Sequence, residues 1–195
     1  MRLRPEQLAQ HLGQGLLPIY VVAGEEPLLI EESLDAIRAR ARQDGYTERE
    51  VHEVERGFDW SRLLGSCASL SLFASRKIVE LRLPKGPNPG RGRAADESED
   101  DGEDAGAGAA QKVDGARLLA ELARRPPQDV LLLLSTGKLD HRQQQAAWYV
   151  AMESAGAAVY AAPITLERWP AWVAQRLRAA GVDADQEAVQ LLAER

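Results

Sequence analysis

An uninterrupted aliphatic run, residues 130–134, lies in this chain of 195 residues. A strand that is apolar at every position is buried on both faces, which is typical of the central strands of a parallel sheet. The run is far too short to cross a bilayer. A second apolar run at residues 17–22 is rich in β-branched side chains and ends at Ala23-Gly24, which predicts another buried strand and a turn. Because such strands need covering helices, the two runs predict an α/β domain.

Strand and helix patterns alternate along the rest of the first 163 residues. Pro27 suits the first turn of a helix, and apolar residues follow it at helical spacing as far as Gly45. Alternation of strands with helices predicts a parallel, doubly wound sheet. The predicted strands are residues 17–22, 50–54, 77–83, 129–135 and 157–161, and the predicted helices are residues 27–44, 60–70, 115–125 and 140–155.

The strand pattern stops after Pro163. A helix is predicted from Leu166 to about Ala180, Gly181 breaks it, and another helix begins at Asp185. We therefore expect two domains, residues 1–163 and residues 164–195. The last helix has no capping glycine, so we expect the second domain to be truncated.

Residues 86–115 are rich in Gly, Pro, Ala and acidic residues, with almost no large apolar side chain. Such a segment cannot bury enough surface to offset its ordering entropy, so we expect a disordered acidic insert. Residues 87–111 hold seven acidic residues and two arginines, and these account for most of the net charge of −6. The remaining chain is close to neutral and shows no basic footprint for DNA.

Several classes of site are missing from the sequence. The single cysteine, Cys67, excludes an intrachain disulfide and fits a reducing cytoplasm, and the first residues do not form a signal peptide. His11, His52 and His141 lack metal-ligand spacing, and no nucleophile motif occurs. We therefore expect a cytoplasmic protein without catalytic residues, metal or cofactor.

The turn after the first predicted strand stands where a nucleotide-binding fold carries its phosphate loop. A phosphate loop needs glycines, whose backbone N–H groups approach the phosphates, and a lysine. Here the turn reads Gly24-Glu25-Glu26-Pro27. Two carboxylates would repel a triphosphate and proline has no N–H to donate, so we expect no ATP binding at this turn.

A cluster of large apolar residues, Leu70-Ser71-Leu72-Phe73, lies between a predicted helix and a predicted strand. Only two phenylalanines occur in the chain, so their positions are informative. A loop that presents Leu and Phe can enter an apolar pocket of a partner, where each buried side chain contributes roughly 1.5–3 kcal/mol. The same residues can instead pack into the core of their own domain, and the pattern alone leaves both interpretations open.

The chain resembles the delta-subunit family of the bacterial DNA polymerase III clamp loader. The resemblance covers most of the chain outside the predicted insert, and it depends on the order and spacing of several motifs together. These motifs are Pro5-Glu6-Gln7-Leu8, Tyr20-Val21-Val22-Ala23-Gly24-Glu25-Glu26-Pro27-Leu28-Leu29, Ser71-Leu72-Phe73-Ala74-Ser75-Arg76, Gly137-Lys138-Leu139, Ala146-Ala147-Trp148 and Trp169-Pro170-Ala171-Trp172-Val173.

The resemblance implies an AAA+-like architecture without a working nucleotide site. Residues 1–163 would be a RecA-like, clamp-binding domain and residues 164–195 the start of a helical lid, and we expect this chain to lack the family's collar domain. Leu72 and Phe73 would enter the hydrophobic pocket of the ring-shaped sliding clamp, and Leu70 would also contact it. General clamp-binding peptides begin with glutamine, where this chain has Ser69.

The implied function is that of a non-catalytic subunit that binds and opens the sliding clamp for loading onto primed DNA during replication. The implied partners are the clamp (beta subunit), the gamma/tau and delta prime loader subunits, and primed DNA within the assembled loader, with no membrane. The chain would be a component of the DNA polymerase III holoenzyme, a nucleotidyltransferase complex, without being an enzyme by itself.

Two functions of other classes stay open beside this one. The first is an AAA+-type ATPase with a degenerate nucleotide loop, which saturable ATP binding would reveal. The second is a DNA-binding module of the same fold. Strong autonomous DNA binding needs clustered Lys and Arg residues, and the near-neutral folded part argues against it.

Overall fold

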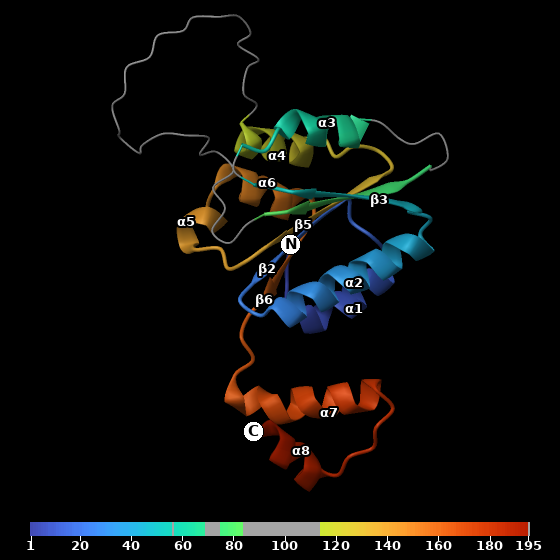
Figure 1. Ribbon diagram of the computed structural model, residues 1–195, viewed down its shortest axis with the longest axis vertical. Coiled ribbons are helices and arrows are strands. Elements are labelled where there is room, and N and C mark those ends of the chain that lie inside the picture. The colour runs from blue at the N-terminus through green and yellow to red at the C-terminus, as the bar shows by residue number, and fades with distance from the viewer. Residues whose placement is uncertain (56, 69–74, 84–113, 195) are drawn as a thin grey trace, which may run out of the picture. The chain divides into compact units, whose positions relative to one another are not determined.

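The computed structural model describes residues 1–195 except 56, 69–74, 84–113 and 195 (Figure 1). Leu70, Leu72 and Phe73, and nearly all of the predicted acidic insert, lie outside the described residues. Contacts divide the chain into two units, Met1–Ala161 and Ala162–Arg195. Across the described ranges, no helix combines the length and the apolar character that a membrane span requires.

The first unit is built on a parallel sheet, which confirms the predicted α/β class (Figure 1). In the described part of the chain six strands form this sheet, in the order β1-β6-β2-β5-β4-β3. The two apolar runs are adjacent at its centre, with Ile19 opposite Leu132. The strands are β1 (Arg2–Leu3), β2 (Ile19–Gly24), β3 (Glu48–Glu53), β4 (Lys77–Arg82), β5 (Val130–Thr136) and β6 (Ala157–Ala161).

Two layers of helices cover the sheet, one on each side (Figure 1). Alternate side chains of the central strands belong to the core on one side or the other. Tyr20 and Leu131 belong to the core on one face, and Ile19 and Leu132 belong to the core on the other. Both layers bury apolar surface, which explains why these strands are apolar at every position. The first layer consists of α1 (Pro5–Gln14) and α2 (Pro27–Gln43), and the second of α3 (Trp60–Ala68), α4 (Gly115–Arg124) and α6 (Ala147–Ala155).

Helix α1 and strand β1 precede the first element that the sequence patterns predict. Strand β1 has two residues, too few for a periodic signal. Helix α1 begins at Pro5, and the Gln7 side chain accepts a hydrogen bond from the Arg4 backbone N–H at 2.9 Å. Leu8 and Leu12, one turn apart, are its buried residues and hold the helix in the first layer.

The single helix predicted at residues 140–155 is wrong, because the structure divides it into α5 (His141–Gln144) and α6. Asp140 and Gln143 form a capping box that starts α5, and the chain leaves helical geometry at Ala146. The break turns α6 so that Trp148 and Met152 are buried in the core between the sheet and the second layer of helices. Tertiary burial therefore overrides a continuous local helix.

The second unit contains two helices in its described residues, as the sequence predicts. A short 3₁₀ turn, η1 (Leu166–Arg168), leads into α7 (Trp169–Ala179), and α8 (Gln186–Ala193) follows. Gly181 adopts a φ of 72°, a left-handed conformation that suits glycine at the break between the helices.

Candidate functional site

A cleft of about 450 Å³ opens at the carboxyl ends of β2 and β5. In parallel α/β sheets this edge is where ligands bind. The β2–α2 turn supplies Gly24, Glu25 and Pro27 to the wall of the cleft, and Lys138 lies across from them in the turn after β5. If this chain bound a nucleotide as related folds do, the phosphates would lie in this cleft.

Lys138 and the amides of the β2–α2 turn have partners within the chain. Lys138 Nζ lies 3.0 Å from Glu25 Oε1, and this hydrogen bond raises the pKa of the lysine. The backbone N–H groups of Glu25 and Glu26 donate to the carbonyl oxygen of Ala161 at the end of β6, at 3.0 and 3.5 Å. The amides that would cradle a phosphate are therefore directed to a neighbouring strand.

Gly24 has a packing role at this turn. A Cβ atom at Gly24 would collide with the backbone carbonyl of Ala161, so no larger residue fits unless β6 moves. Glycine here allows two strands to approach closely, which explains its presence without a bound phosphate.

The predicted docking segment, residues 69–74, lies outside the described residues, but its two flanks are described. Helix α3 buries Trp60, Leu63 and Cys67, whereas Leu64 is exposed on its outer side. Burial raises the pKa of the Cys67 thiol to about 11, so this cysteine is an inert core residue. The segment is thus flanked by a well-packed helix and by a strand inside the sheet.

Four polar residues beneath α3 form what we call the Glu50 cluster: Glu50 and His52 on β3, Ser66 on α3 and Lys77 on β4. Ser66 Oγ donates to Glu50 Oε1 at 2.6 Å, and His52 Nε2 lies 2.9 Å from the same Ser66 oxygen. Lys77 Nζ lies 3.4 Å from Glu50 Oε2. Burial alone would raise the pKa of Glu50, but hydrogen bonds from Ser66 and Lys77 and the nearby positive charge outweigh burial and lower it.

The Glu50 cluster has the residue types of a hydrolytic triad but the wrong geometry. In a triad the acid holds one ring nitrogen of histidine while the other faces serine. Here Glu50 Oε1 lies 3.2 Å from Nε2 of His52, the same nitrogen that faces Ser66. The cluster therefore joins three elements and carries no nucleophile. The sequence interpretation missed it, although the i, i+2 spacing of Glu50 and His52 places both on one face of a strand.

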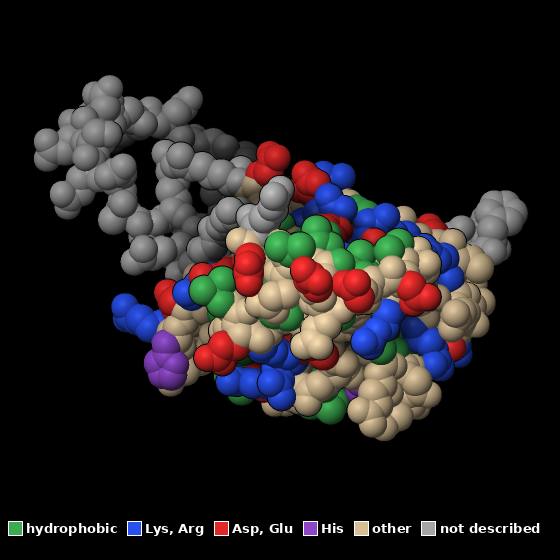
Figure 2. Space-filling model, turned by 90° about the horizontal axis from the view of Figure 1, so that it is seen from below, with side chains coloured by type: hydrophobic (Ala, Val, Ile, Leu, Met, Phe, Trp, Pro, Cys, Tyr) green, Lys and Arg blue, Asp and Glu red, His purple; other side chains and the backbone are tan. Residues whose placement is uncertain are grey.

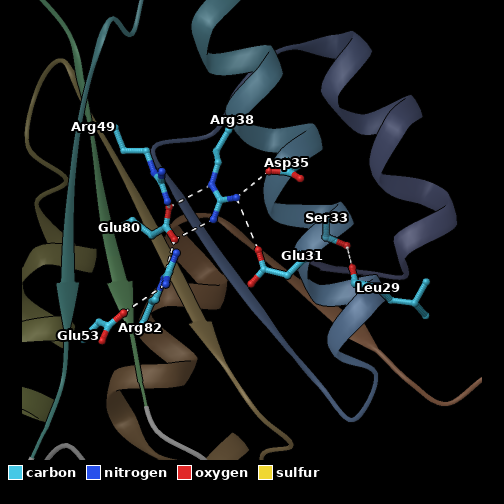
Figure 3. Close-up of polar contacts among 9 residues, drawn as sticks. All are labelled: Leu29, Glu31, Ser33, Asp35, Arg38, Arg49, Glu53, Glu80 and Arg82. Atoms are coloured by element: carbon cyan, nitrogen blue, oxygen red, sulfur yellow. Dashed lines mark hydrogen bonds and ion pairs between the residues drawn. The ribbon is translucent and has the colours of Figure 1, made fainter.

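A second carboxylate, Glu80 on β4, is fully buried on the opposite face of the sheet (Figure 3). Arg38 of α2 donates to both of its oxygens, at 2.8 and 3.1 Å. Arg49 lies 2.8 Å and Arg82 3.2 Å from the same carboxylate. Burial would raise the pKa of Glu80, but the hydrogen bonds from the three arginines and the charge of Arg38 hold it below its usual value. These contacts hold α2 against the sheet.

Within the described ranges, no group of three or more His, Cys, Asp and Glu side chains is placed to hold a metal ion. His11, for example, lies 3.0 Å from the hydroxyl of Tyr20 and has burial as the main cause of its lowered pKa.

Comparison with known proteins relates the chain to one family. Residues 20–99 match the family model described as DNA polymerase III, delta subunit. DNA polymerase III subunit delta of Haemophilus influenzae is 33% identical over 194 residues, and that of Escherichia coli K12 is 32% identical over 193 residues. Each comparison covers 98% of this chain and 49% of the relative, so the chain spans about half the length of these relatives.

A solved structure supports the fold independently. The DNA clamp loader delta protein of Bacillus subtilis aligns with a TM-score of 0.64 at 14% identity, covering 96% of this chain and 51% of that one. At this identity the likeness concerns the fold alone, and it agrees with a RecA-like parallel sheet followed by helices.

Proposed function

We propose, from the membership of this chain in the family of DNA polymerase III delta subunits, that it binds the sliding clamp and opens it for loading onto primed DNA. The observation that carries the proposal is the 32–33% identity to delta subunits over 98% of the chain. The chain would act in the cytoplasm with the beta clamp and the gamma/tau and delta prime subunits, as a component of the polymerase III holoenzyme.

The proposed docking residues are Leu70, Leu72 and Phe73. They follow α3, whose apolar face is anchored in the core, so the helix gives the segment a rigid support. Leu72 and Phe73 would fill an apolar pocket on the clamp, with Leu70 in a supporting contact. Opening requires differential affinity, so the chain should bind the open or monomeric clamp more tightly than the closed ring.

The direct test is a titration of this chain with the sliding clamp from the same source, in closed and in monomeric form. We expect saturable binding to both forms and a lower Kd for the monomer. Binding that favours the closed ring would contradict clamp opening, and the absence of binding to either form would contradict the whole proposal.

The proposal also assigns no nucleotide chemistry to the chain itself. An ATPase would have to bind its nucleotide in the cleft beside Gly24. There, however, Lys138 forms an ion pair with Glu25, and the loop amides donate hydrogen bonds to Ala161. We expect a fluorescent ATP analogue to show no saturable binding at micromolar concentrations. Saturable binding that unlabelled ATP displaces would instead support the AAA+-type ATPase.

Autonomous DNA binding is the less favoured alternative. On the face that Figure 2 shows, Lys and Arg side chains of the described residues lie among acidic ones. Phosphate contacts need clustered positive charge, so contact with primed DNA is proposed only within the assembled loader.

A further inference from the structure

One carboxylate touches both flanks of the docking segment. The segment lies between α3, which ends at Ala68, and β4, which begins at Lys77. Ser66 in the last turn of α3 and Lys77 at the start of β4 contact the two oxygens of Glu50, at 2.6 and 3.4 Å. We propose that Glu50 is a positioning residue for clamp binding, because it ties the two ends of this segment together. The inference rests on the proposed function.

Lys77 depends on its contact with Glu50 because of where the lysine side chain lies. The Lys77 side chain is only 3% exposed, and a buried ammonium group needs a charged or hydrogen-bonded partner. Within the described residues, the carboxylate at ion-pair distance from Lys77 is that of Glu50. Loss of the carboxylate would leave this charge poorly compensated, and the start of β4 would be held less firmly.

Glu50 itself can be changed without opening a large cavity, because its side chain is 40% exposed. Its removal would break the link between α3 and β4 and leave the apolar contacts of both elements in place. Substitution at this position should therefore loosen the link between the two flanks, and the unpaired Lys77 should also lower the free energy of unfolding.

The flank beyond the segment has further contacts that do not reach α3. Arg76 donates to the carbonyl oxygen of Asp44 at 2.8 Å and pairs with Asp129 at 3.3 Å. These bonds fix the end of the segment next to β4. The distance between that end and α3 is set by the Glu50 cluster instead. A segment with both ends held loses less conformational entropy when it docks, and this favours affinity.

The test compares Glu50→Ala and Glu50→Gln with Glu53→Ala, in titrations against the sliding clamp. Glu53 is a matched control, because it lies on the same strand, points to the opposite face and pairs with Arg82. We expect Glu50→Ala to raise the Kd about tenfold, which is the scale of ordering a few side chains. Glu50→Gln, which keeps an oxygen for Ser66 but loses the charge opposite Lys77, should raise it less, and Glu53→Ala should leave it unchanged.

Hydrogen exchange separates positioning from general destabilisation. In Glu50→Ala the amides of residues 66–68 and 75–77, which flank the segment, should exchange faster by a larger factor than those of β2 and β5. Unchanged affinity in Glu50→Ala, an equal loss in Glu53→Ala, or an acceleration in β2 and β5 as large as that at the two flanks would each overturn the inference. If Leu72→Ala with Phe73→Ala abolishes clamp binding while Glu50→Ala does not weaken it, the proposed function stands and only this inference fails.

Discussion

Replacing Leu72 and Phe73 together by alanine should weaken clamp binding by about 100-fold or more. Burial of each Leu or Phe side chain contributes roughly 1.5–3 kcal/mol, and about 1.4 kcal/mol changes Kd tenfold. A few apolar anchors carry most of the energy of a typical interface, so two of them should decide whether the complex forms. Kd values for the wild type and the double variant, measured against the same clamp preparation, provide the check.

The control for this prediction is Leu28→Ala. Leu28 is an exposed leucine at the start of α2, so its truncation removes exposed apolar surface at a site with no proposed contact. Thermal unfolding should show that both variants fold like the wild type. An unchanged Kd in the folded double variant would refute the assignment of Leu72 and Phe73, and an equal loss in Leu28→Ala would show that the effect is not specific.

Glu80→Ala should lower the free energy of unfolding by about 3–5 kcal/mol, which is the usual cost of removing one partner from a buried ion pair. Arg38, whose side chain is buried, would lose the carboxylate to which it donates two hydrogen bonds, and Arg49 and Arg82 would lose a shared partner (Figure 3). Urea denaturation followed by circular dichroism measures the change.

Glu53→Ala again serves as the control, because exposed Glu53 also pairs with Arg82, at 3.3 Å. An exposed pair contributes at most about 1 kcal/mol, so this variant should unfold nearly like the wild type. Equal losses in the two variants would show that the buried position of Glu80 does not matter.

The Glu80 carboxylate should also make stability depend on pH. Its folded-state pKa lies below the ordinary value of 4.5, so its contribution is present above that pH and disappears as pH falls through the folded-state pKa. The difference in unfolding free energy between wild type and Glu80→Gln should therefore be largest near neutral pH and shrink in acid. A difference that stays constant down to low pH would contradict the lowered pKa.

Much of the layered fold could be predicted from the sequence, because periodicity is a local signal. The runs at residues 17–22 and 130–134 indicated buried strands, and the structure places them side by side as β2 and β5. Strand β1 was too short to detect, and the break between α5 and α6 could not be seen, since it depends on burial of Trp148 in the second core. Local patterns therefore predict where helices and strands occur better than they predict the residues at which one helix ends and the next begins.

At the turn after β2, too, local sequence patterns could predict only part of what the structure shows. Its residue types, two carboxylates and a proline, are enough to argue against phosphate binding. The structure adds that the amides of Glu25 and Glu26 bond to Ala161 and that Lys138 pairs with Glu25. Those partners come from distant parts of the chain, so no local pattern could identify them.

Local patterns were enough to predict the α/β class, the two buried central strands and a loop chemistry unsuited to phosphate, because each depends on neighbouring residues. Which charges meet could be read only from the folded chain. Glu50 and Glu80 are both acidic residues in strands whose sequences mix polar and apolar side chains. Glu50 nevertheless joins α3 to β4, whereas Glu80 holds α2 against the sheet. Those roles follow from the register of β3 on β4 and from the helix packed on each face, which long-range packing sets.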